Sequence, residues 1–234
     1  NQVAMDFKLI FDPLRVKLGR LAITLPEGKI AVDGAAAAEP DGWRWALNLT
    51  SGSATPEHIL RYWPSDLKPK LRRWVAANIL AGALSDINLS LRSAPNQKLR
   101  THLGFLFSDA RVIFLKTLPP LQDAVGYATL TDTRFVARVE SGWVKAAQGG
   151  MIDAAGTTFV IPDTRIKPAP AEVKLIANSS LEAALSILDE PPFRFVSKSK
   201  LRTQTMQGRA QVAAKFNFVL KKKLPPKQVR FEAT

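Results

Sequence analysis

Apolar residues recur at every second position over most of this 234-residue chain. A two-residue period is typical of strands with one apolar and one polar face. The runs end at turn signals such as Asp12-Pro13 and Asp41-Gly42, which predicts hairpins in succession. The clearest runs are Val3 to Phe11, Leu14 to Leu25, Ile30 to Val32, Trp43 to Leu49, Ile87 to Leu91, Leu99 to Phe107, Val112 to Phe114, Phe135 to Trp143, Thr158 to Ile161, Phe193 to Phe195 and Val212 to Leu220. We therefore expect a mostly β protein with a few helices, built as an antiparallel meander.

One long segment has helical spacing instead. Its apolar positions fall on one helical face: Leu67, Leu71, Trp74, Val75 and Ile79. Pro69 lies near its start and Gly82 just past its end, the usual places for these residues around a helix. The pattern predicts one amphipathic helix near residues 66–81, laid as a plug or cap against the sheet.

Two shorter helices are also indicated. Thr55-Pro56-Glu57 combines a capping threonine, a proline and an acid, which predicts a short helix from His58 to Trp63. Ser179 to Glu182 has the spacing of a capping box before an apolar run, which predicts a short helix near residues 181–188. The whole chain then forms a single β-rich segment, 1–234, with sub-blocks 1–54 and 83–234 around a helical insert at 55–82.

The apolar strand faces allow two architectures. In a closed sandwich they would pack together as an ordinary core. In a sheet that curls without closing, they would line an apolar trough. Periodicity leaves both open, because a one-residue slip in register exchanges the two faces of a strand. The candidate lining of a trough is Trp43, Trp45, Leu47, Leu49, Leu103, Phe105, Phe107, Phe135, Val139, Phe216, Phe218 and Leu220.

The amino-acid composition excludes some kinds of chemistry and favours some kinds of partner. The chain has no cysteine, which excludes disulfides and thiolate chemistry. No run reaches the roughly 18 apolar residues that span a bilayer as a helix. The chain begins at Asn1, so we expect a piece of a longer protein whose membrane anchor lies outside these residues. The net charge of +13 favours anionic partners such as lipid head groups, or else only marks a basic surface.

Catalytic motifs are missing. His58 and His102 have no acid or nucleophile at motif spacing, so both are interpreted as ordinary surface residues. Phosphate-binding glycine loops, nucleophile elbows and metal motifs are absent from the sequence, so we expect no enzyme, no cofactor and no metal site. Basic residues are dispersed, and Lys221 to Lys223 is too short for a basic arm, so nucleic acid is not an expected partner.

Several motifs occur in the same order as in a known family. The chain resembles the YhdP-type members of the AsmA-like (AsmA/TamB/YhdP) bacterial envelope proteins over roughly residues 55 to 215. The resemblance is carried by Tyr62-Trp63-Pro64, Leu67, Arg72, Trp74-Val75, Asn78 and Gly82, then Pro119-Pro120-Leu121, Asp123, Gly126, Phe135, Gly142 and Phe159-Val160-Ile161-Pro162-Asp163, and finally Leu185 to Pro192 and Gly208-Arg209-Ala210.

The resemblance implies a fold and a function. It implies a U-shaped sheet, or β-taco, with an apolar inner groove, held in the periplasm from an inner-membrane anchor. It further implies phospholipid transport to the outer membrane, as part of outer membrane biogenesis, without catalytic residues. We expect a non-enzymatic, phospholipid-binding segment of such a bridge-like protein, with anionic lipids favoured by the basic excess. The alternative is a structural or interaction module of the cell envelope without lipid transport, and a general polyanion-binding protein ranks lower.

Overall fold

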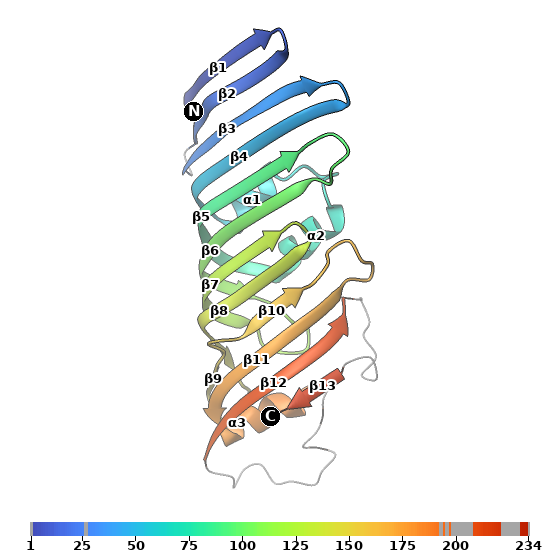
Figure 1. Ribbon diagram of the computed structural model, residues 1–234. Helices are drawn as coiled ribbons and strands as arrows, with labels where there is room; N and C mark the ends of the chain where they lie inside the picture. Colours follow the sequence, from blue (N-terminus) through green and yellow to red (C-terminus); the bar gives the residue numbers. More distant parts are fainter. Residues whose placement is uncertain are drawn as a thin grey trace.

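One antiparallel sheet forms the body of the molecule (Figure 1). The computed structural model describes residues 2–25, 28–191, 194, 197, 208–220 and, for the backbone alone, 230–233. Its strands are β1 (Gln2–Phe11), β2 (Leu14–Leu25), β3 (Gly28–Glu39), β4 (Gly42–Ala54), β5 (Ile79–Ser93), β6 (Arg100–Val112), β7 (Leu121–Thr131), β8 (Arg134–Lys145), β9 (Met151–Asp153), β10 (Thr158–Ile161), β11 (Pro170–Ser180), β12 (Arg209–Val219) and β13 (Arg230–Ala233). The runs predicted at Phe193 to Phe195 and the basic Lys221 to Lys223 lie outside the described residues.

The strand order follows the chain. Strands β1 to β8 pair with their sequence neighbours, the path continues through β10 to β13, and the short β9 pairs with β8 and β11 beside it. All these pairings are antiparallel, so the predicted meander is confirmed. In the described part of the chain every strand belongs to this sheet, and β1 and β13 lie at its two ends. The closed sandwich is therefore wrong: among the described residues, no second sheet faces the apolar side of these strands.

Helices occupy one edge of the sheet. The helices are α1 (Pro56–Tyr62), α2 (Pro69–Asn78) and α3 (Leu181–Asp189), and all three lie in connections on the edge where β4 and β11 end. Short turns join the strands at the opposite edge, for example at Asp12-Pro13 and Asp132-Thr133. Figure 1 shows α1 and α2 behind the middle strands. The sheet thus has a hairpin edge and a helix edge.

Bulges near the helix edge bend the middle strands. Register shifts occur in β5, β6, β7 and β8, and the residues there have a positive φ: Gly82, Asp86, Asp109, Asp123 and Gly142. Glycine adopts this backbone at no steric cost, and aspartate tolerates it better than most residues. Each bulge bends its strand and increases the local twist. A row of bulges across neighbouring strands therefore curls the sheet into an open groove.

The helix predictions need three corrections. The amphipathic helix runs from Pro69 to Asn78, shorter than the expected 66–81, because Ile79 already begins β5. Gly82 does not end a helix; it lies in β5 at φ 135°, where a side chain would meet Ala110. The insert between the strand sub-blocks is accordingly 55–78. In α3 the capping residue is Ser180, whose hydroxyl accepts from Ala183 N at 3.1 Å, one residue later than the predicted box.

Candidate functional site

A continuous apolar face runs along the sheet. Residues directly opposite each other in an antiparallel pair lie on the same side of a sheet, so the register traces each face from strand to strand. One such row crosses nine strands without a polar residue: Met5, Leu21, Val32, Leu49, Leu89, Leu103, Leu130, Phe135 and Ile161. At about 4.8 Å between strands, this row alone is about 38 Å long. We call the side that carries it the apolar face.

A second row extends the apolar face to the C-terminal strands. It consists of Phe105, Ala128, Ala137, Phe159, Val173 and Phe216. The Phe135 and Phe159 rings meet edge to face, with centroids 6.2 Å apart. Because the two rows overlap on β6, β7, β8 and β10, the apolar face is unbroken from β1 to β12.

The residues predicted to line a trough all follow this alternation. Trp43 to Leu49 lie on β4, Leu103 to Phe107 on β6, Phe135 and Val139 on β8, and Phe216 and Phe218 on β12. Leu220 lies just past β12, where its backbone N–H donates to Ala169 O at 2.8 Å. The register thus brings the predicted residues to one side of the sheet, and their binding role stays a prediction.

Small residues form the middle of the apolar face. Strand β7 places Ala124, Gly126 and Ala128 there, and the two alanines are buried. A Cβ on Gly126 would come within 2.7 Å of Phe107 Cζ and would also collide with the Arg138 carbonyl oxygen. The Phe107 ring therefore lies over the bare backbone of the neighbouring strand. The surface of the apolar face is therefore lower at β7 than at β6 and β8, whose side chains on this face are larger.

The N-terminal end of the apolar face is uncovered. On β1, Val3, Phe7 and Phe11 are 66%, 59% and 78% exposed. On β4, Trp43 is half exposed as well. Among the described residues no side chain larger than alanine is fully buried, so the strand faces have not formed a conventional interior. Sequence reasoning placed no lining residue on β1 to β3, although the same alternation marks them.

The C-terminal end is covered by α3. A cluster of buried side chains joins Ala146, Ile152, Ala177 and Ala183, with Leu175, Ile187 and Val212 packed against it. Ala177 and Val212 are cross-strand partners on the apolar face, and Ala183 of α3 is completely buried. The helix thus closes this end of the face by direct packing.

Helix α2 packs through only part of its predicted apolar stripe. Leu67, just before the helix, and Leu71 and Trp74 within it are about half exposed, contrary to the expected plug against the sheet. The half-buried side of α2 includes Val75 and also Arg72, which donates to Leu60 O at 3.0 Å and to Trp63 O at 3.2 Å. These bonds satisfy carbonyls at the end of α1, where helices leave acceptors unpaired. Arg72 therefore ties α2 to α1 and turns the stripe outward.

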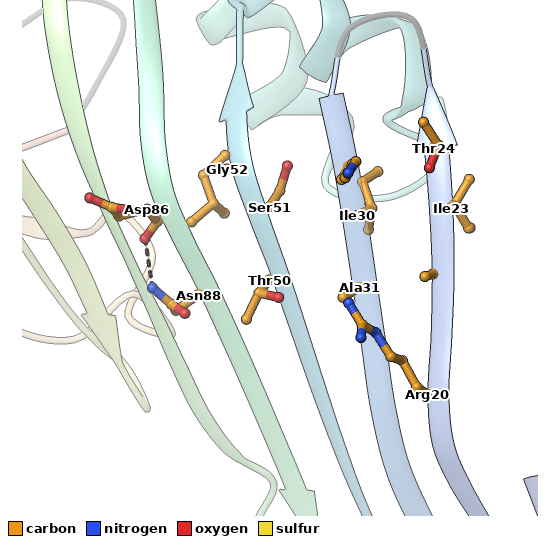
Figure 2. Close-up of a pocket in the computed structure, with 13 residues that line it drawn as sticks. Arg20, Ile23, Thr24, Ile30, Ala31, Thr50, Ser51, Gly52, Asp86 and Asn88 are labelled. Carbon is orange, nitrogen blue, oxygen red and sulfur yellow. Dashed lines mark hydrogen bonds between the residues drawn. The ribbon is translucent and has the colours of Figure 1, made fainter. Parts of the chain in front are cut away.

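The opposite side of the sheet is polar and charged, and two hollows are found on it. One, of about 330 Å³, lies over β2 to β5 and is lined by Arg20, Thr24, Thr50, Asp86 and Asn88 among others (Figure 2). Figure 2 shows Arg20 extending across β3 toward Ala31. The other lies nearer the hairpin edge. The apolar face is thus a broad trough, whereas both of these half-open hollows belong to the polar face.

Exposed ion pairs hold the hairpin edge. Arg165 donates to Asp163 at 2.7 Å, and its side-chain hydrogen bond lowers the pKa of that carboxyl to about 2. At the β7–β8 turn, a hydrogen bond from Thr101 N, assisted by Arg100, lowers the pKa of Asp132. Asp163 accepts from the backbone amide of Arg165 in its own turn, and Asp132 accepts from the amide of Thr101 on the neighbouring strand, so the role of both carboxylates is to fix turns.

Neither histidine belongs to a catalytic cluster. His102 is exposed on the polar face of β6, as expected. His58 is half buried and its Nδ1 is shielded without a hydrogen-bond partner among the described residues, so it is not the surface residue that the sequence indicated.

No cluster of metal-ligating side chains was found in the part of the chain that the structure describes. No helix there has the length and apolarity needed to cross a bilayer.

Comparisons with family models, curated proteins and solved structures gave no match for this chain.

Proposed function

We propose that the apolar face binds the hydrocarbon tails of phospholipids and that the chain carries them along the sheet. One observation supports this most directly: apolar side chains continue in register across the sheet and, toward the N-terminus, are left uncovered. Exposed apolar surface of this extent usually marks a binding surface. The resemblance to YhdP-type envelope proteins supports the same function and a periplasmic location, with an inner-membrane anchor elsewhere in the protein.

The energetics of a lipid tail favour such a face. Exposing a tail of ~16 methylenes to water costs on the order of 13 kcal/mol, at about 0.8 kcal/mol for each methylene. A carrier must therefore cover the tail along its whole route. Leucine, phenylalanine and valine cover it without directional bonds, so a tail can slide from one strand to the next. Head groups stay in water at the open side of the groove.

Photocrosslinking tests the proposal at matched positions. Photoreactive residues at Phe105 and Phe218 lie on the apolar face, whereas Leu106 and Asn217 lie next to them on the polar face. We expect phospholipid to be captured from the first pair, with capture from the second pair at least about tenfold lower, because tails favour apolar contact. Equal capture from both pairs contradicts the proposal.

Native mass spectrometry provides an independent test. We expect phospholipid to remain bound to the purified protein, and tail binding to persist in high salt because it does not depend on charge. A protein that carries no lipid from membranes or from added vesicles would instead act as a bracing or interaction module of the envelope.

A further inference from the structure

The hollow near the hairpin edge of the polar face is lined by basic side chains. It is a half-open hollow with a volume of about 500 Å³. Strands β2, β4, β5 and β6 and the β5–β6 hairpin contribute these basic residues: Arg15, Lys17, Arg44, Arg92, Lys98 and Arg100. All six are exposed, and no carboxylate lines the hollow.

Register shows that the basic residues surround a floor of alanines. One row of cross-strand partners runs Lys8, Lys17, Ala35, Ala46, Arg92 and Arg100, and the next runs Ile10, Arg15, Ala37 and Arg44. Alanine leaves the backbone of β3 and of part of β4 accessible to a ligand. Because strands are about 4.8 Å apart, long basic side chains on β2 and β4 reach over β3 from both sides.

This arrangement places like charges directly opposite each other. Lys8 faces Lys17, and Arg92 faces Arg100. Such pairs destabilise a sheet, and an anion bound between them would relieve this repulsion.

The available carboxylates compensate only part of this charge. Glu39 pairs with Arg44 at 2.6 Å and Asp132 pairs with Arg100 at 2.9 Å. Arg15, Lys17, Arg92 and Lys98 have no carboxylate partner among the described residues.

Arg92 is held in place by neutral acceptors. Its guanidinium donates to Leu47 O at 3.0 Å and to Asn48 Oδ1 at 2.6 Å, and Asn48 in turn donates to Asp33 at 2.7 Å. A fixed guanidinium loses little freedom when it binds an anion, which suits arginine to phosphate recognition.

We propose that this hollow binds a ligand that carries two or more phosphate groups. One phosphate lies over Ala35 and Ala37, between the side chains of β2 and Arg44. The next lies over Ala46, beside Arg92 and Lys98. A soluble phosphorylated small molecule and a phosphorylated lipid head group both supply this chemistry. The hollow lies on the opposite side of the sheet from the apolar face, so this inference does not depend on lipid-tail binding.

Calorimetric titration of the folded chain with sodium tripolyphosphate tests the site. We expect saturable binding that weakens as salt rises, and orthophosphate binding at least about tenfold weaker, because it fills one position only. The double variant Arg15→Gln/Lys17→Gln removes two exposed cations that have no carboxylate partner among the described residues, and we expect it to weaken tripolyphosphate binding at least about tenfold. Failure of tripolyphosphate to bind the original chain overturns the proposal.

A matched variant separates a site from general charge. Arg134→Gln/Arg138→Gln removes the same charge from exposed positions on β8, and we expect binding within about twofold of the original. An equal loss in both double variants overturns the proposal, because net charge would then explain the binding. Lys98→Gln, on the hairpin outside the strands, gives a second measurement that does not depend on strand packing, and here we expect a loss of about threefold.

Vesicles distinguish the source of the phosphate. Cardiolipin is the lipid probe because its head group carries two phosphates. We expect sedimentation with cardiolipin-containing vesicles, but not with phosphatidylcholine vesicles, to fall in the β2 variant if head groups enter the hollow. Unchanged sedimentation, together with the loss of tripolyphosphate binding, assigns the hollow to a soluble ligand. Lipid-tail crosslinking at Phe105 should be unaffected in all these variants, so failure of one proposal leaves the other testable.

Discussion

The two ends of the apolar face have the same alternating pattern but different surroundings. At the N-terminal end, Phe7 and Phe11 of β1 remain more than half exposed. At the C-terminal end, Ala183 of α3 packs onto the face, and Ala177 and Ile152 are buried beside it. Strand pattern alone therefore does not decide burial. At this end the connection that follows β11 decides it, because its helix α3 packs onto the face.

The largest expected difference in stability is between two variants, each of which shortens one apolar side chain at one end of the apolar face. Ile152→Ala should lower the free energy of unfolding by about 2–4 kcal/mol, because it leaves a cavity in the cluster under α3. Phe7→Ala removes a larger side chain, yet should cost less than about 1 kcal/mol, because most of that ring is already in water. Urea unfolding of both variants measures the difference. Similar losses would mean that the two ends are equally packed.

The next effect concerns the small residues between the two ends. Gly126→Ala should lower the free energy of unfolding by about 1–3 kcal/mol, because its methyl group would overlap the Phe107 ring and the Arg138 carbonyl. Gly104→Ala on the neighbouring strand is the control, since its nearest atom is His102 Nε2 at 3.7 Å. Thermal unfolding compares the two. A stable Gly126→Ala variant would show that Phe107 moves aside freely.

Lipid capture should differ between the open and covered parts of the face. A photoreactive residue at Leu49 should capture phospholipid several-fold better than one at Val212, which packs against the cluster under α3. Adding Ile187→Ser should raise capture at position 212, because the contact that holds α3 down is weakened. Quantitative mass spectrometry of the crosslinked products measures both. No difference between the two positions would show that α3 does not restrict access.

The smallest effect concerns a turn at the hairpin edge. Arg165→Gln should raise the pKa of Asp163 from about 2 toward its ordinary 3.8, because the guanidinium that stabilises the carboxylate is removed. The contribution of this pair to stability is present above pH 3.8 and is lost as the pH falls through about 2. NMR titration of the carboxyl carbon measures the pKa, and a value that stays near 2 would assign the shift to the backbone amide alone.

Alternation predicted most of the fold. It identified many of the strands, the meander and the apolar residues of β4, β6, β8 and β12, because side-chain direction in a strand has a period of two. It marked no run at β7, β9 or β11, because β9 is only three residues long and small or polar residues interrupt the large apolar ones in β7 and β11. It left open whether the faces close on each other, since the same pattern suits a sandwich and a curled sheet. The curl depends on bulges at positions such as Asp86 and Asp123, where an aspartate is compatible with both regular and left-handed backbone.

The sequence did not predict how helix α2 packs or that basic residues gather at one hollow. The stripe of Leu67, Leu71 and Trp74 correctly predicted a helix, but these three side chains stay about half exposed, and within α2 only Val75 of the predicted stripe lies on the half-buried side. The orientation of α2 is set by Arg72, whose side chain reaches carbonyls nine and twelve residues earlier in the sequence. The basic hollow was missed because its residues come from strands far apart in the chain, and only the register brings them together.

Neighbour-to-neighbour strand pairing has a consequence for how the chain reaches this structure. Almost every strand pairs with the next strand in the sequence. During folding, strand pairing can therefore extend outward from any hairpin, and adding most strands requires only the small entropic cost of closing a short loop. Removing or inserting a whole hairpin would also leave the inward and outward positions of the remaining strands unchanged. The sheet is thus suited to assembly from one end as the chain emerges, and to changes in span by whole hairpins.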